Sequence, residues 1–195
     1  MKYILIISLL LNLCGCLPAI FSAAATTGVV LTQDRSAGNA LDDATIWAKI
    51  KSSYLQDDIN NLFAHIDVKV NEARVLLTGY TTDPEIRIKA VQIAWEQKGV
   101  KEVINEINLT EPTDKLAIKD YSLDTWITAQ IKAKLLVNKY IKSVNYSVIT
   151  LNQTVYLFGV AQDEDELNNV SDIVSKTRFV KHVISHVKIK ENIEG

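Results

Sequence analysis

The feature that most constrains the fold is an internal repeat with a spacing of 80–81 residues. Ala48-Lys49-Ile50-Lys51 recurs as Ala129-Gln130-Ile131-Lys132, and Val75-Leu76-Leu77-Thr78-Gly79 recurs as Val155-Tyr156-Leu157-Phe158-Gly159. The repeat predicts two domains of one fold. We place them at residues 42–111 and 122–191, with a linker at 112–121 and a tail at 192–195. Each copy has roughly 70 residues, near the lower limit for an independent hydrophobic core, so we expect the two copies to support each other.

Each copy has the same predicted order of elements. A first helix carries an acidic residue near its start, Asp43 or Asp124, which we expect to cap free N–H groups. Two alternating strands follow, joined by a short polar turn. A second helix opens with Asp83-Pro84-Glu85 or with Asp163-Glu164-Asp165-Glu166, and an alternating strand ends the copy. The order predicts an α+β fold of two αββαβ units, each a small mixed sheet covered on one face by two helices.

The N-terminus has the pattern of a secretory signal. Met1-Lys2 precedes an apolar stretch of about 11 residues, which is too short to span a ~30 Å hydrocarbon core. Leu13-Cys14-Gly15-Cys16 resembles the bacterial lipobox. The resemblance implies cleavage after Gly15, a diacylglycerol on the Cys16 thiol and further acylation, for example by palmitate. Residues 1–15 are then the signal peptide and residues 16–41 a flexible tether. The alternative is an ordinary signal peptide or an uncleaved anchor. Leu17, which stands where an Asp would resemble an inner-membrane retention signal, favours the outer membrane.

The repeated units resemble the BON domain. The resemblance rests on the element order, on Gly79 and Gly159 at the end of the second strand, and on Gly99-Val100-Lys101-Glu102-Val103 and Phe179-Val180-Lys181-His182-Val183 before the last. We interpret both glycines as structural positions rather than ligand contacts. A more specific resemblance, to the dual-BON outer-membrane lipoproteins of the DolP or YraP type, rests on the following segments: Asp34-Arg35-Ser36-Ala37-Gly38, Asp42-Asp43, Asp124-Thr125-Trp126-Ile127-Thr128 and Leu135-Leu136.

That resemblance implies a lipid-anchored protein on the periplasmic face of the outer membrane. It also implies binding of anionic phospholipid through the first helix of the second domain, accumulation at division sites and support of envelope integrity. No cofactor is expected apart from the covalent lipid on Cys16.

The first helix of the second copy has a second apolar face. At about 100° per residue, Ile127, Ile131 and Leu135 share one stripe, which should face the sheet. An opposite face carries Trp126, Ala129, Ala133 and Leu136, where the first copy has Thr45, Ala48, Ser52 and Leu55. Lys132 and Lys134 flank this face and Lys139 follows it. A tryptophan on an apolar strip with basic flanks suits a membrane interface, so these seven residues are the predicted phospholipid-binding site.

Two other occupants of this face stay open. It could pack against the first domain, or it could bind a protein, in which case the chain would be an interaction adaptor for outer-membrane assembly proteins. The sequence alone does not decide between lipid, protein and domain one.

Composition argues against several other functions. The net charge of −2 is not typical of a nucleic-acid-binding protein. Both cysteines lie in the first 16 residues, so the domains lack thiols for catalysis, disulfides or zinc. His182 and His186 are predicted on a strand about 13 Å apart, too far for one metal, and we expect both to face solvent. No nucleophile–base pattern or phosphate-binding loop is present, so we predict that the protein is neither an enzyme nor a metalloprotein.

Overall fold

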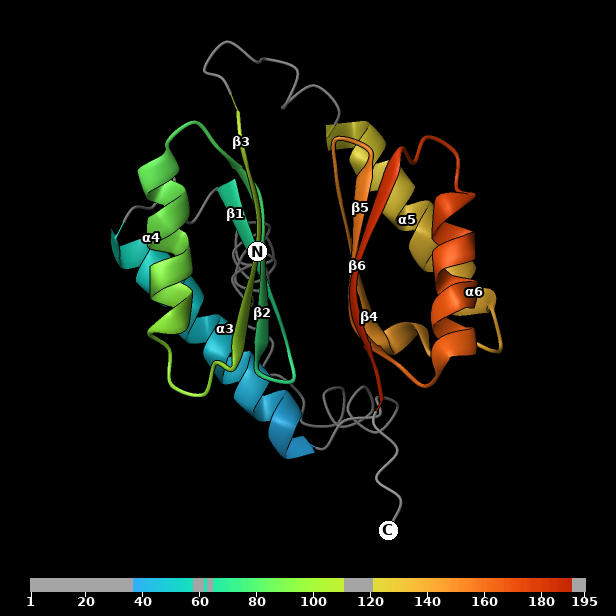
Figure 1. Cartoon of the computed structure of the whole chain (residues 1–195), viewed down its shortest axis with the longest axis horizontal. Coiled ribbons are helices and arrows are strands. Elements are labelled where there is room, and N and C mark those ends of the chain that lie inside the picture. The colour runs from blue at the N-terminus through green and yellow to red at the C-terminus, as the bar shows by residue number, and fades with distance from the viewer. Residues whose placement is uncertain (1–36, 58–61, 63–64, 111–120, 191–195) are drawn as a thin grey trace, which may run out of the picture.

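The structure is a computed structural model that describes residues 37–57, 62, 65–110 and 121–190 (Figure 1). The first copy consists of α3 (Ala37–Asp57), β1 (Ile66–Asn71), β2 (Arg74–Thr81), α4 (Pro84–Trp95) and β3 (Glu102–Leu109). The second copy consists of α5 (Tyr121–Val137), the short 3-10 helix η3 (Ser143–Asn145), β4 (Tyr146–Leu151), β5 (Thr154–Ala161), α6 (Glu164–Ser175) and β6 (His182–Ile189). The predicted αββαβ order and α+β class are confirmed.

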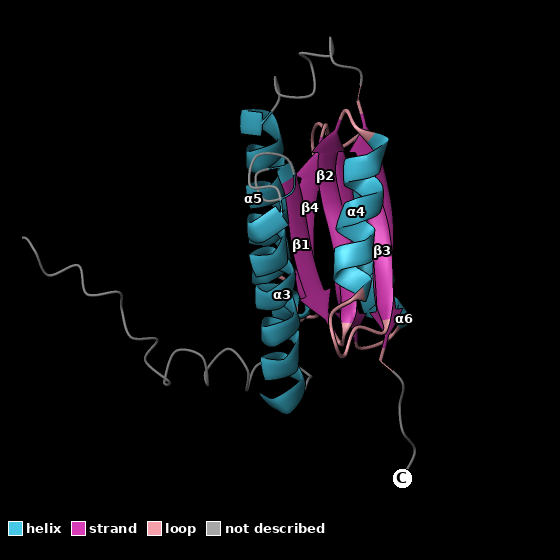
Figure 2. Ribbon diagram, turned by 90° about the vertical axis from the view of Figure 1, so that its left-hand side faces the viewer, coloured by secondary structure: helices cyan, strands magenta, loops and turns pink. Residues whose placement is uncertain are grey.

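Each copy has a three-stranded mixed sheet. In the first, β2 pairs antiparallel with β1 and parallel with β3; in the second, β5 pairs in the same way with β4 and β6. The parallel pair forms because the second helix returns the chain to the same end of the sheet. Figure 2 shows α3 over the β1 side of its sheet and α4 over the β3 side. Both helices of a copy thus cover one face, as predicted.

The apolar stripe of each first helix forms the centre of its core. Ile127, Ile131 and Leu135 of α5 are at most 1% exposed, which confirms their predicted direction toward the sheet. In α3 the matching residues are Ile46, Ile50 and Tyr54, and the hydroxyl of Tyr54 donates to the Ala90 carbonyl at 2.9 Å. Burial raises the pKa of this phenol, so it stays protonated as a donor.

The predicted openings of the second helices are confirmed. Asp83 precedes α4, and its side chain accepts a hydrogen bond from the Glu85 N–H, with Pro84 in the first turn. Asp163 precedes α6 and accepts from the Glu166 N–H. In both copies the acidic side chain satisfies an N–H group that has no partner within the helix.

The predicted role of Asp43 and Asp124 as helix caps is wrong. Helix α3 begins at Ala37, so Asp43 lies in its second turn, whereas Asp124 lies in the first turn of α5, near the helix start as predicted. Residues 37–41, which we expected in the tether, are helical. Each carboxylate instead accepts two hydrogen bonds from a hairpin turn. Asp43 accepts from the N–H groups of Glu72 and Ala73 at 2.9 and 2.8 Å, and Asp124 from those of Asn152 and Gln153 at 2.6 and 2.8 Å.

Gly79 and Gly159 lie where an edge strand approaches closely. Both have a φ of +146°, a conformation that strains other residues. A Cβ atom on Gly79 would collide with the carbonyl oxygen of His65, and one on Gly159 with that of Asn145. The missing side chain therefore allows β1 and β4 to begin against the middle strand.

The two copies pack against each other through their sheets. Leu76, Tyr156 and Phe158 form a buried cluster between them. Partly buried residues that pack on this cluster are Ile104, Ile149, Leu151 and Ile184. The result is four layers, with the two sheets inside and the helices of each copy on the outside (Figure 1). The expectation that the copies support each other is therefore confirmed.

Charged side chains tie the two copies together at the edge of this interface. The Arg74 side chain donates to Glu102 at 2.9 Å and to the His186 carbonyl at 2.8 Å, and its guanidinium lies 5.1 Å from the Phe158 ring centroid. Lys188 approaches Glu102 to 3.2 Å. Although desolvation by burial raises the pKa of Glu102, the hydrogen bonds from Arg74 and Lys188 outweigh it and leave the pKa below its ordinary value.

The expectation that His186 faces solvent is wrong. Its Nε2 atom lies 2.7 Å from the Glu106 carboxylate of the first copy, and both side chains are 24% exposed. The alternation of β6 puts His186 on the sheet face away from the helices, and the other sheet covers that face. His182, at the start of the strand, is exposed as expected.

Candidate functional site

The outward face of α5 is built as the sequence predicts. All seven residues of the predicted site are exposed, and Trp126 and Leu136 are 41% and 72% exposed. This outcome follows from the helix geometry, because the opposite stripe is held in the core by Ile127, Ile131 and Leu135. We call this outward face the α5 face; its predicted residues are Trp126, Ala129, Lys132, Ala133, Lys134, Leu136 and Lys139.

The alternative that the α5 face packs against the first domain is wrong. The two copies meet through their sheets, whereas α5 packs on β4, η3 and α6 of its own copy. In Figure 1 α5 and α6 lie on the side of the second sheet away from the first copy. The Trp126 ring packs edge-on against the ring of Phe179, with centroids 5.7 Å apart and planes at 63°. The face remains accessible to a lipid or a protein.

The charge around the α5 face is positive. Lys132 and Lys139 are exposed, and the Lys139 ammonium lies 4.8 Å from the Tyr140 ring centroid. The Lys134 ammonium donates to the Thr177 hydroxyl at 3.0 Å, on the loop after α6. Asp124, the sole acidic residue between Leu123 and Val144 in the sequence, points its carboxylate at the β4–β5 turn. The helix therefore presents bases outward and turns its acid inward.

The structure adds residues that the sequence reasoning missed. Val137, the last residue of α5, is 83% exposed and lies within about 20° of Trp126 around the helix. Tyr140, in the turn after α5, is 70% exposed. Phe179 comes from a different element and is 43% exposed. A position-by-position comparison of the copies would have indicated Phe179, because the first copy has Gly99 there.

Exposed tryptophans are not confined to the second copy. Trp47 of α3 and Trp95 of α4 are 45% and 51% exposed, slightly more than Trp126. Trp47 matches Thr128, two residues from the Trp126 position, and so lies on another side of its helix. What distinguishes the α5 face is therefore the surrounding aromatic and basic side chains, not tryptophan exposure alone.

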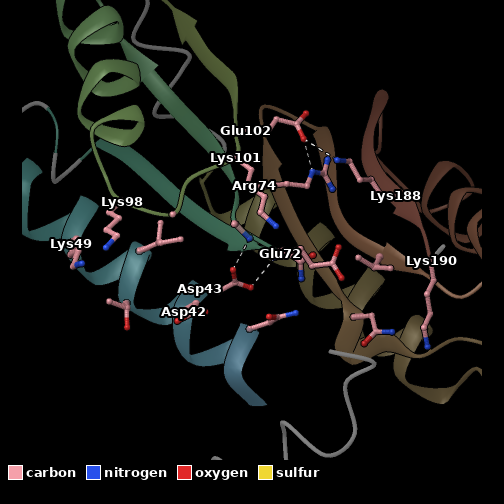
Figure 3. A pocket seen from close by; sticks show the side chains of 18 of the residues that line it. Asp42, Asp43, Lys49, Glu72, Arg74, Lys98, Lys101, Glu102, Lys188 and Lys190 are labelled. Atoms are coloured by element: carbon pink, nitrogen blue, oxygen red, sulfur yellow. Dashed lines mark hydrogen bonds and ion pairs between the residues drawn. The ribbon is translucent and has the colours of Figure 1, made fainter. Parts of the chain in front are cut away.

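A cleft between the copies is a separate feature of the surface (Figure 3). Two of its carboxylates are engaged in the fold, since Asp43 holds the β1–β2 turn and Glu102 bridges Arg74 and Lys188. Lys49, Lys98 and Lys101 also line it. In the part of the chain that the structure describes, no group of three or more His, Cys, Asp or Glu residues is arranged to bind a metal ion.

The proposed lipid anchor lies outside the described residues. Cys16, the signal peptide and residues 16–36 of the tether all precede Ala37, the first described residue. Within the described ranges, no helix has the length and apolar character that a membrane span requires.

The chain is a duplicated α+β domain protein. Its two αββαβ units have the same strand register, and each has a glycine where the edge strand comes close to the middle strand. The family model of the BON domain matches residues 42–111 and 123–191, and the chain belongs to the BON domain family.

Relatives match along most of the chain. An uncharacterized protein in the gshII 5′ region of Anaplasma centrale is 44% identical, over 78% of this chain and 97% of the relative. The outer membrane lipoprotein DolP of Haemophilus influenzae is 30% identical, over 89% of this chain and 88% of the relative. The osmotically-inducible protein Y of Escherichia coli is 29% identical, over 78% of this chain and 75% of the relative. These matches support an outer-membrane lipoprotein of the BON family.

Proposed function

We propose that this protein is a non-enzymatic, lipid-anchored component of the outer membrane that binds anionic phospholipid through the α5 face. Cys16 carries the lipid and holds the domains at the periplasmic face. The bound phospholipid then recruits the second domain to the leaflet, in support of envelope integrity at division sites. The similarity to a DolP lipoprotein supports the anchor and the location.

The observation that carries the proposal is the composition of the α5 face. Trp126 exposes an aromatic ring that suits the boundary between headgroups and acyl chains. Leu136 and Val137 expose apolar side chains beside it, without a covering element from the first copy. Each lysine near an anionic surface contributes about 1 kcal/mol, so Lys132, Lys134 and Lys139 together favour anionic over neutral lipid.

The test is vesicle co-sedimentation of the chain from residue 16 onward with Cys16→Ser, which removes the anchor. We expect binding to vesicles that contain phosphatidylglycerol, weaker binding as salt rises, and little binding to phosphatidylcholine alone. Trp126→Glu should abolish binding because it places a charge at the centre of the apolar strip. The matched control is Trp47→Glu, which changes an equally exposed tryptophan of the first copy.

Fluorescence gives an independent readout. With Trp47 and Trp95 replaced by Phe, the remaining Trp126 emission should shift to the blue on anionic vesicles. The proposal fails if Trp126→Glu and wild type bind equally. If no vesicle binds but crosslinks from position 126 capture one discrete protein, the α5 face is the docking surface of an interaction adaptor instead.

A further inference from the structure

The loop between α6 and β6 lies beside the α5 face and adds a second aromatic ring to it. Phe179 of this loop packs edge-on against Trp126, with ring centroids 5.7 Å apart. The loop is also joined to α5 by the hydrogen bond from Lys134 to Thr177, at 3.0 Å. Two elements that lie far apart in the sequence therefore meet at one exposed surface.

Phe179 adopts a backbone conformation that an aromatic residue disfavours. Its φ is +72°, in the left-handed region, where a Cβ atom crowds the backbone. Gly99, the matching residue of the first copy, has a φ of +99°. Glycine would satisfy the loop without strain, and the Phe179 ring gains no full burial, because it stays 43% exposed. Neither loop geometry nor core packing explains a phenylalanine here.

Both members of this contacting pair differ between the copies in the same direction. Where the second copy has Trp126 and Phe179, the first has Thr45 and Gly99. Two positions on different elements therefore carry large aromatic rings together in one copy and small residues together in the other. Such a paired difference is expected if the two rings form one surface.

The charge at the pair fits an anionic lipid surface. The Arg178 guanidinium lies over the Phe179 ring, 4.4 Å from its centroid. Arg178 follows Thr177, which holds the Lys134 ammonium, so two cationic groups lie close to the exposed aromatic rings. Aromatic side chains with cations beside them match the boundary between acyl chains and phosphate groups.

We propose that Arg178 and Phe179 of this loop are a second membrane-inserting element, which enters an anionic phospholipid leaflet together with Trp126. The Phe179 ring enters the acyl boundary and Arg178 contacts lipid phosphates. The proposal rests on the proposed function of the α5 face and adds a separate loop to it.

The test is Phe179→Gly, which installs the residue of the first copy, in the same Cys16→Ser chain. We expect the affinity for phosphatidylglycerol vesicles to fall by roughly tenfold, while the Tm stays the same or rises because the left-handed strain is removed. Arg178→Gln should lower the affinity and flatten its salt dependence. Ile88→Gly, at an exposed site on α4, is the matched control and should leave vesicle binding unchanged.

A second measurement places the loop directly. In the Cys16→Ser chain from residue 16, which has no other cysteine, an environment-sensitive fluorophore on Phe179→Cys should shift to the blue on anionic vesicles, and one on Ile88→Cys should not. Wild-type binding by Phe179→Gly with loss of binding by Trp126→Glu would overturn the role of the loop and leave the proposed function standing. A lowered Tm in Phe179→Gly would make Phe179 a structural residue and also overturn it. Absence of wild-type binding would overturn both proposals.

Discussion

Asp43 offers a quantitative test of how the hairpins are built. It is 4% exposed, and its carboxylate accepts hydrogen bonds from the N–H groups of Glu72 and Ala73. These two turn residues have φ values of +54° and +61°, which residues other than glycine, asparagine and aspartate disfavour. A hydrogen bond to a charged group contributes about 1.5–3 kcal/mol. We therefore expect Asp43→Ala to lower the free energy of unfolding by about 3 kcal/mol.

The assay is urea denaturation followed by circular dichroism. Asp43→Asn keeps one acceptor oxygen, so the free energy of unfolding should fall by about half as much as in Asp43→Ala. Asp42→Ala, at the adjacent exposed position, is the control and should stay within about 0.5 kcal/mol of wild type. Asp124→Ala should lower the free energy of unfolding by less than Asp43→Ala does. The reasons are that Asp124 is less buried and that Asn152 of its turn tolerates the left-handed region.

A rescue experiment separates the turn from other contacts of Asp43. The double change Glu72→Asn and Ala73→Gly gives a turn that adopts positive φ without help. In the Asp43→Ala background it should recover about 1–2 kcal/mol. The reasoning is refuted if Asp43→Ala is within 0.5 kcal/mol of wild type, or if Asp124→Ala is the more damaging change.

Three further predictions concern the strands and the interface. Gly159→Ala should lower the free energy of unfolding by about 2–4 kcal/mol, because its Cβ meets the Asn145 carbonyl. Gly99→Ala should lower it by only about 1 kcal/mol, because its Cβ lies 3.5 Å from a flexible side-chain atom. Thermal denaturation of the two variants tests this difference. Phe158→Ala should lower the free energy of unfolding by about 3–5 kcal/mol, and the two copies should then unfold in two calorimetric transitions. A single unchanged transition would contradict the sheet–sheet interface. Since the folded state lowers the Glu102 pKa, its stabilising effect should be complete above the ordinary value of 4.5 and be lost as the pH falls through the folded pKa. Urea midpoints across this range should show less pH dependence in Glu102→Gln.

The sequence predicts most of each domain because the relevant information is local. The stripe of Ile127, Ile131 and Leu135 and the openings of α4 and α6 depend on periodicity and on first-turn chemistry, and all are confirmed. The same periodicity gives the exposure of the α5 face. The start of α3 at Ala37 was missed because the low charge and the many small residues before Asp42 led us to interpret this stretch as a tether.

What the sequence does not predict is set by contacts between distant segments. The direction of Asp43 depends on a turn 29 and 30 residues away in the chain. The position of His186 depends on a sheet from the other copy. A clue to that interface was available, because Leu76, Tyr156 and Phe158 place large apolar residues on the strand face that alternation would make polar. Such residues indicate that both faces of a sheet are covered.

The sheet–sheet arrangement explains how one copy could acquire a binding surface without loss of the fold. Because the two sheets cover each other, α3, α4, α5 and α6 keep their outward faces free of the interface. Substitutions there change neither a core nor the contact between copies, so Thr45 and Gly99 in one copy can correspond to Trp126 and Phe179 in the other. The first copy buries Leu76 against Phe158 and so supports the second domain. If the α5 face binds lipid as proposed, the two domains differ in function although they share one fold.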